Sequence, residues 1–177
     1  MSENLSSEGK SVSSLLRWLL FIYVFVLGIY LGGAIFETVV IVPIWSTSVD
    51  AARYFNQNPL SIFNTRNFFF IVAPLSTLLS VITLITGWRT AQPVRFWLRL
   101  AIIPFLIIFL TPAFYFVPEQ LAIKGTPAQN LSDAELTLRA SRWVMLNWIR
   151  FLVSFPMWGA TLHALGLAYR QSAKTND

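Results

Sequence analysis

The sequence predicts an all-α integral membrane protein, an antiparallel bundle of four transmembrane helices. Of the 177 residues, 55% are hydrophobic and only 12% are charged, and the mean hydropathy is +0.61, which is far more apolar than a soluble domain. Crossing a bilayer core takes about 20 apolar residues. Stretches of that length occur four times, roughly at 15–45, 68–88, 97–117 and 143–169. The chain has no cysteine, which excludes disulfides and thiolate metal ligands.

The first apolar stretch, 15–45, follows a polar and serine-rich beginning. Residues 1–14 have hardly any large apolar side chain, so they cannot bury enough surface to offset the entropy of ordering, and we expect a disordered tail. A cleavable signal peptide is the competing interpretation of 15–45. Its apolar run is longer than the roughly 7–15 residues of a signal core, however, and no clear small-residue cleavage site follows it. We therefore expect a transmembrane helix.

Lys and Arg side chains set the expected orientation. The connection between the second and third stretches, GWRTAQPVRFWLR, is short and basic, and short basic loops stay in the cytoplasm. Both termini, including a tail at 171–177, would then be cytoplasmic, in a bacterial inner membrane. Trp45 and Trp143 would belong to the outer aromatic belt. The net charge of +5 reflects the basic inner rim and does not indicate nucleic-acid binding.

The two outer loops are longer than a four-helix bundle requires. In the first loop a short helix is expected near 49–55, before the turn-prone sequence NQNP. In the second loop, LSDAEL places Ser132 and Glu135 at the spacing of a capping box. This spacing predicts a helix that begins there and runs into the fourth stretch. The loops form either a lid over the outer end or simple solvated connections.

One carboxylate and one guanidinium lie inside the predicted spans at similar depth. Glu37, in GGAIFETVVIVPIW, lies about two turns before Trp45, and Arg150 lies about two turns after Trp143 on a helix of opposite direction. At a rise of 1.5 Å per residue both lie in the outer half of the membrane, where an isolated charge is costly. We therefore expect Glu37 and Arg150 to pair. A purely structural buried pair is the alternative to a functional one.

Other polar and aromatic side chains gather near that depth. Asn147 lies one turn from Arg150 on the same helix face, and Trp143 lies one turn further out. Tyr30 and Glu37 share one stripe of the first helix. Together they would form a pocket with an apolar slot. Besides the carboxylate, five residues are expected to contact its ligand: Arg150, Asn147, Trp143, Tyr30 and Tyr115.

Two further features favour structural explanations. Gly28 and Gly32 form a GxxxG step, which indicates close helix packing inside the bundle or in a homo-oligomer more than a ligand site. His163 is the single histidine and lies far from Arg150 along the last helix. One histidine without cysteine is too few for a tetrahedral zinc site or a two-histidine haem site. We therefore expect no metal and no other cofactor.

Several pieces of the sequence resemble a known family. In order, GGAIFETVVIVPIW, FFFIVAPLSTL, IIPFLIIFLTPAFYFVPEQL, LSDAEL and RWVMLNWIR are similar to the small four-helix membrane proteins grouped with the fungal anthrone oxygenases, most of whose bacterial members are uncharacterised. The resemblance covers about residues 25 to 165. Its most specific part is R-W-x-x-x-N-x-x-R, which runs here from Arg142 to Arg150. The step PEQ at 118–120, where many relatives have Pro and Asn, indicates a divergent bacterial branch.

The resemblance implies an oxygenase that acts on a polycyclic phenolic ketone without metal or flavin. Removing a carbon-bound proton beside an aromatic ketone requires a base, a donor for the enolate oxygen and an apolar slot. Glu37 would be the base, and Arg150 and Asn147 would stabilise the enolate. The alternative is a non-enzymatic bundle in the lipid bilayer that binds a lipid, a quinone or a partner membrane protein. Whether the protein is an enzyme at all stays open at this point.

Overall fold

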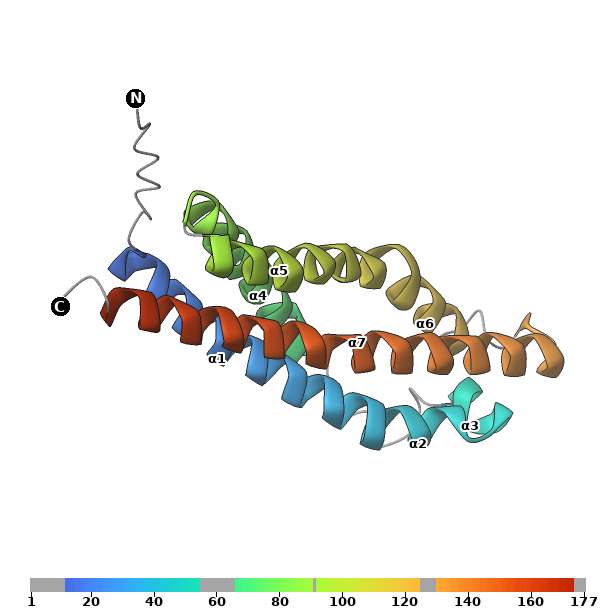
Figure 1. Cartoon of the computed structure of the whole chain (residues 1–177). Helices are drawn as coiled ribbons and strands as arrows, with labels where there is room; N and C mark the ends of the chain where they lie inside the picture. Colours follow the sequence, from blue (N-terminus) through green and yellow to red (C-terminus); the bar gives the residue numbers. More distant parts are fainter. Residues whose placement is uncertain (1–11, 55–65, 91, 125–129, 174–177) are drawn as a thin grey trace, which may run out of the picture.

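The computed structural model describes residues 12–54, 66–90, 92–124 and 130–173; nearly all of them lie in helices, and no strand occurs among them (Figure 1). The all-α prediction is confirmed for these residues. Most of the expected tails, 1–11 and 174–177, lie outside them. Four helical spans are long and apolar enough to cross a membrane, as predicted: Ser14–Ser46, Asn67–Gly87, Gln92–Ile123 and Asp133–Ala173.

The first span is built from three consecutive helical elements: α1 (Ser14–Phe36), the π-helical segment η1 (Glu37–Ile41) and α2 (Val42–Ser46). The side chain of Ser13 caps α1 by accepting a hydrogen bond from the backbone N–H of Leu16 at 3.2 Å. In η1 the N–H of Val42 reaches back to the carbonyl of Glu37, which makes a widened turn. Pro43 follows directly. A proline ring clashes with the carbonyl four residues before it, and a widened turn makes room for that ring.

The third span repeats this design. Its elements are α5 (Gln92–Thr111), the π-helical segment η4 (Pro112–Phe116) and α6 (Val117–Lys124). The N–H of Val117 bonds to the carbonyl of Pro112, and Pro118 follows. Both π segments therefore end directly before a Val-Pro pair. The span begins before and ends after the expected range 97–117.

The remaining helices are α3 (Val49–Tyr54), α4 (Arg66–Gly87) and α7 (Asp133–Ala173). The capping box before α7 is confirmed: Ser132 N–H donates to Glu135 Oε2 at 3.1 Å, and Glu135 N–H donates to Ser132 Oγ at 3.3 Å. As predicted, α7 begins there and continues without a break through the fourth apolar stretch. The short helix expected at 49–55 is α3, and Phe55 lies outside the described residues.

The four long helices pack in a closed circuit. α1 contacts α4 and α7, and α5 contacts the same two helices, so the first and last helices are neighbours, as expected (Figure 1). The contacts between α1 and α7 join the start of one helix to the end of the other. Arg17 bonds to Ser172, and Trp158 Nε1–H donates to the Val24 carbonyl at 3.3 Å. A large apolar core fills this part of the molecule and includes Tyr23 and Phe105.

A second core lies beyond the end of α4, among α2, α3, η4, α6 and the first turns of α7. Trp45 and Trp143 meet at its centre with ring centroids 5.1 Å apart. They are 0% and 2% exposed, so the expectation that they belong to a lipid-facing outer belt is wrong. The reason is that α6 and α7 extend past these tryptophans, and their side chains cover the indole rings. Ile123 and Leu136, both fully buried, belong to this cover.

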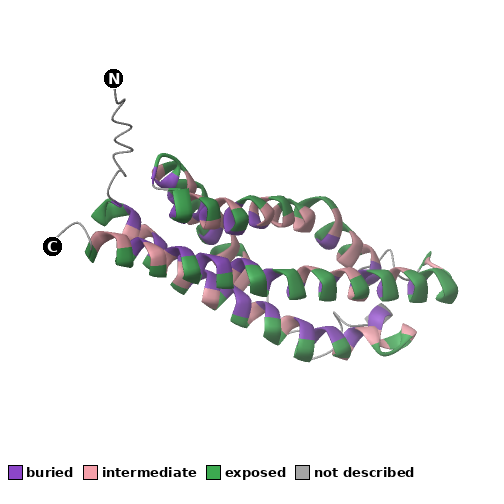
Figure 2. Ribbon diagram, viewed as in Figure 1, coloured by how far each residue is buried: buried purple, intermediate pink, exposed green. Residues whose placement is uncertain are grey.

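The outward faces of the helices are apolar. Exposed residues follow the outer side of every long helix (Figure 2), and many of them are large hydrophobic side chains, among them Phe25, Ile71, Ile107, Phe114 and Leu152. Soluble monomers rarely expose apolar patches of more than a few hundred Å². The surface is therefore suited to an apolar surrounding.

The two glycines of the GxxxG step, Gly28 and Gly32, have different surroundings. A Cβ at Gly28 would lie 3.6 Å from Nε1 of Trp158 on α7, so this glycine packs inside the chain. A Cβ at Gly32 would meet nothing within 4 Å. Gly32 alone therefore leaves room for a second copy of the chain.

Candidate functional site

A chain of hydrogen bonds crosses the interior between α7 and η1. Asn147 Nδ2 donates to Thr38 Oγ1 at 3.0 Å, and Arg150 Nη2 donates to Asn147 Oδ1 at 2.7 Å. Asn147 is 1% exposed and Thr38 is 3% exposed, so water does not compete for these bonds. The amide of Asn147 uses both of its ends and fixes the guanidinium of Arg150 relative to the first span.

The aromatic ring of Phe116 holds Arg150 from the third span. The guanidinium carbon lies 4.3 Å from the ring centroid, within the range of a cation–π contact. The carbonyl of Phe116 in turn accepts a hydrogen bond from Trp143 Nε1–H at 3.0 Å. Thr38 lies in η1 and Phe116 lies in η4, so each π segment contributes one residue that contacts the same part of α7. We call Thr38, Phe116, Asn147 and Arg150 the polar cluster.

In the described residues, the contacts found for Arg150 do not include a carboxylate. A guanidinium has five N–H donors, and the contacts found for Arg150 in the described part of the chain are one amide oxygen and one aromatic face. Neither contact carries a negative charge. Donors of Arg150 are therefore available to an oxygen atom of a ligand.

Two other expected site residues lie near the polar cluster. Tyr30 is buried and packs edge-to-face against Phe69 and Phe105, with centroids 5.7 and 6.1 Å away. The charges of Arg150 and Glu37 both act on its hydroxyl electrostatically. Glu37 is half-buried and is the first residue of η1. The contacts found for Arg150 are those with Asn147 and Phe116. A direct ion pair between Arg150 and Glu37 therefore stays a prediction.

The last two expected residues have different surroundings. Trp143 is enclosed in the outer core, where its N–H is already bound. Tyr115 is the neighbour of Phe116 in η4, but it lines a hollow nearer the outer end of α7. Of the five residues expected to contact a ligand, Asn147 and Arg150 are hydrogen-bonded to each other, Tyr30 packs against Phe69 and Phe105, and Trp143 and Tyr115 belong to the adjoining outer core and hollow. Their binding of a ligand stays a prediction.

Sequence reasoning missed Thr38 and Phe116. Thr38 continues the buried stripe of Leu31 and Ala34 at helical spacing. This spacing was the only feature of the sequence that indicated an inward-facing Thr38. A threonine in an apolar helix attracts little notice, because its hydroxyl can bond to a carbonyl of its own helix. Phe116 is one of 15 phenylalanines, and nothing in the sequence distinguishes it.

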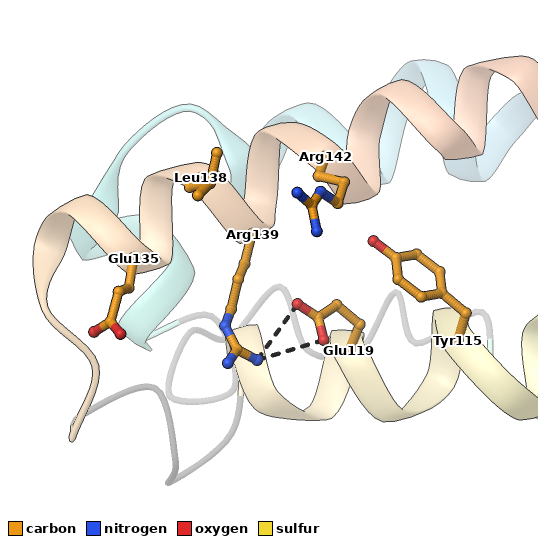
Figure 3. Close-up of a pocket in the computed structure, with 6 residues that line it drawn as sticks. All are labelled: Tyr115, Glu119, Glu135, Leu138, Arg139 and Arg142. Atoms are coloured by element: carbon orange, nitrogen blue, oxygen red, sulfur yellow. Dashed lines mark hydrogen bonds and ion pairs between the residues drawn. The ribbon is translucent and has the colours of Figure 1, made fainter.

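A hollow of about 380 Å³ lies between α6 with η4 and the first turns of α7 (Figure 3). An ion pair crosses it: Arg139 Nη1 lies 3.5 Å from the carboxylate oxygens of Glu119. We call this hollow the outer groove. Its lining residues are Tyr115, Glu119, Glu135, Leu138, Arg139 and Arg142.

Metal binding finds no support in the described ranges, where no three residues of the types His, Cys, Asp and Glu gather as a metal site would require. His163 is exposed and stacks on Trp97, with centroids 4.4 Å apart. It lies at the opposite end of the bundle from the outer groove.

Comparison of the chain with protein-family models, with curated proteins and with solved structures found no match. The resemblance to the anthrone oxygenases therefore stays an expectation from the sequence. The function has to be argued from the polar cluster itself.

Proposed function

We propose that this is an integral membrane protein of a bacterial inner membrane, an antiparallel four-helix bundle with both termini cytoplasmic. The apolar outer faces of all four spans support this proposal. The 22 residues of α4 match the roughly 20 that cross a bilayer core. Arg89, in the short connection after α4, and Arg95, in the first turn of α5, support the cytoplasmic assignment. Gly32, which faces open space, is the place where a second copy of the chain would pack.

Within that membrane protein, the polar cluster is a binding site for an apolar aromatic molecule that carries a ketone or phenol oxygen. The observation that carries this proposal is the state of Arg150, which is oriented by Asn147 and Phe116 but has no anionic partner among the contacts found for it. A guanidinium at membrane depth is costly. An oxygen acceptor from a ligand would offset part of that cost.

The aromatic residues beside the cluster suit the rings of such a ligand. Phe116 lies on one side of Arg150. Tyr30, with its partner Phe69, lies close enough for the charge of Arg150 to act on its hydroxyl. Aromatic rings prefer edge-to-face and offset contacts with one another, so these side chains would select flat aromatic molecules over aliphatic ones.

The enzymatic form of the proposal assigns a base to the site. Glu37 would take a proton from a carbon next to the ligand carbonyl, and the negative charge would move onto the oxygen held by Arg150. Dioxygen would then be the co-substrate of an oxygenase. Two observations favour the enzymatic form. Glu37 is the chain neighbour of Thr38, which belongs to the polar cluster, and the charges of Glu37 and Arg150 both act on the hydroxyl of Tyr30.

The alternative is a bundle without a small-molecule ligand, in which the polar cluster only fixes helix register. Tryptophan fluorescence of the protein in mild detergent, titrated with anthrone, separates the two. Arg150→Gln should weaken anthrone binding about tenfold or more, because a charge-assisted hydrogen bond is lost.

Arg99→Gln is the matched control for this titration. It also removes an arginine from an aromatic face, 4.0 Å from Trp88, but at the other end of the bundle, so binding should not change. Equal binding by wild type and Arg150→Gln would refute the site. Glu37→Gln should keep binding, and loss of oxygen consumption in that variant would establish the enzymatic form.

A further inference from the structure

The outer groove has two acidic residues whose carboxylates are already engaged. Glu119 faces Arg139 across the groove at 3.5 Å. Glu135 accepts from the N–H and the hydroxyl of Ser132, at 3.1 and 2.8 Å. The negative charges of the groove are therefore taken up by the fold.

Two donors of the outer groove are not engaged. The hydroxyl of Tyr115 is buried and makes no hydrogen bond within the described structure. Arg142 is exposed, and among the described residues it forms no ion pair or hydrogen bond. Figure 3 shows the two side chains extending from opposite walls, with the hydroxyl and the guanidinium facing the same space. A cation and a hydroxyl donor that converge in this way suit an anionic oxygen.

The depth of Arg142 points to the origin of that anion. Arg142 and Arg170 lie on the same helix, 170 − 142 = 28 residues apart, which is about 42 Å at 1.5 Å per residue. A bilayer with its headgroup layers is about 40–45 Å thick. If Arg170 lies in the inner headgroup layer, Arg142 lies in the outer one.

The surface of α7 between Arg142 and the proposed membrane interior is apolar. Met145 and Ile149 follow Arg142 at spacings of three and seven residues, so they share its side of α7. They are 56% and 52% exposed, and Leu138 on the same side is 62% exposed. A hydrocarbon chain attached to an anion at Arg142 would therefore run along these side chains.

We propose that the outer groove binds the phosphate group of a membrane phospholipid, with Arg142 and Tyr115 as the phosphate contacts and one acyl chain along Met145 and Ile149. A volume of about 380 Å³ is sufficient for a small headgroup, since small-molecule pockets begin at about 300 Å³. This site is separate from the polar cluster. It rests on the membrane integration proposed above.

Native mass spectrometry of the full chain in mild detergent tests the proposal. The probes are dioleoylphosphatidylglycerol and dioleoylglycerol, which differ in the phosphate headgroup. Wild type should retain the phospholipid about tenfold more strongly than the diacylglycerol, and Arg142→Gln should abolish most of that preference. Tyr115→Phe, which keeps the ring, should reduce the preference about threefold; it provides a second test if Arg142→Gln fails to fold.

Arg170→Gln is the charge-matched control, since Arg170 is also exposed on α7 but lies at the other end; it should behave as wild type. Unchanged phospholipid preference in Arg142→Gln, or an equal loss in Arg170→Gln, would overturn the proposal. Displacement of the lipid by millimolar inorganic phosphate would also overturn it, because the site would then serve soluble anions.

The proposal for the polar cluster and the proposal for the outer groove can be refuted separately. Arg150→Gln should leave phospholipid binding intact, and Arg142→Gln should leave anthrone binding intact. A protein that stays monodisperse in water without detergent would instead remove the membrane proposal on which the lipid site depends.

Discussion

The hydrogen bond between Asn147 and Thr38 joins segments that are 109 residues apart in the chain, and its removal is the sharpest test of the polar cluster. Thr38→Val keeps the shape of the side chain and removes the hydroxyl acceptor. The Nδ2 group of Asn147, 1% exposed, would then lack its partner. Asn147→Leu removes the same bond from the other side and also takes the amide oxygen away from Arg150.

The expected magnitudes follow from these contacts. Interhelical hydrogen bonds in membrane proteins contribute about 0.6 kcal/mol on average and at most about 1.7 kcal/mol. Because the bond is short and shielded, Thr38→Val should cost about 1 kcal/mol. Asn147→Leu should cost about 2–3 kcal/mol, since a hydrogen bond to a charged group is worth about 1.5–3 kcal/mol. The double change should cost about 1 kcal/mol less than the sum of the single changes.

Reversible unfolding in mixed micelles with increasing dodecyl sulfate, followed by tryptophan fluorescence, measures these free energies. Thr161→Val is the control partner. Thr161 is fully buried on the same helix, but its hydroxyl bonds to the carbonyl of Met157 in its own helix, at 2.9 Å. Its effect should add to that of Thr38→Val. Additivity of Thr38→Val and Asn147→Leu within about 0.3 kcal/mol would refute the reasoning, because uncoupled sites behave in that way.

Two further predictions concern packing and orientation. Gly166→Ala should stabilise the protein by up to about 1 kcal/mol, since the added Cβ meets nothing within 4 Å. Gly33→Ala should destabilise it by about 1 kcal/mol or more, because its Cβ would overlap the ring of Phe68; equal unfolding midpoints would contradict this packing. The chain has no native cysteine, so Ala134→Cys should react with an impermeant maleimide from outside the cell and Gln92→Cys only after the membrane is opened. The reverse pattern would invert the proposed orientation.

Hydropathy was sufficient to predict the number of long apolar helices but not their ends. Apolar runs of membrane length have few alternatives to a long helix, so all four were found. Hydropathy alone would start the fourth helix near Trp143, whereas the capping box correctly predicted a start at Asp133. Leu136 and Ala140 of these added turns bury their side chains in the outer core. Such burial depends on α3 and α6, and their docking cannot be derived from the α7 sequence alone. The same docking encloses the tryptophans that were expected to face lipid.

The sequence predicted that α7 meets the first helix near Glu37, but it did not identify the side chain that forms the hydrogen bond found there. Counting along both helices matched the level of Glu37 to that of Arg150, yet the buried residue that bonds to α7 is Thr38. The expected stripe of Tyr30 and Glu37 spans seven residues, an interval over which side chains drift by about 20° on a straight helix. In addition, the helix changes to π geometry at Glu37 itself. Regular periodicity cannot anticipate such a change.

The two π segments also determine how the protein tolerates changes in chain length. A π turn holds one residue more than the α-helix needs for the same path, so deletion of one residue inside it would leave an α-helix in which the residues beyond the deletion keep their direction around the helix axis. In η1 such a deletion would keep Trp45 against Trp143, and in η4 it would keep Glu119 opposite Arg139. The inner core, which lies before η1 and η4 along their spans, would keep its register. Single-residue gaps at Glu37–Ile41 or Pro112–Phe116 in homologous sequences should therefore mark proteins that keep both ends of the bundle, with an uninterrupted α-helix in place of the π turn.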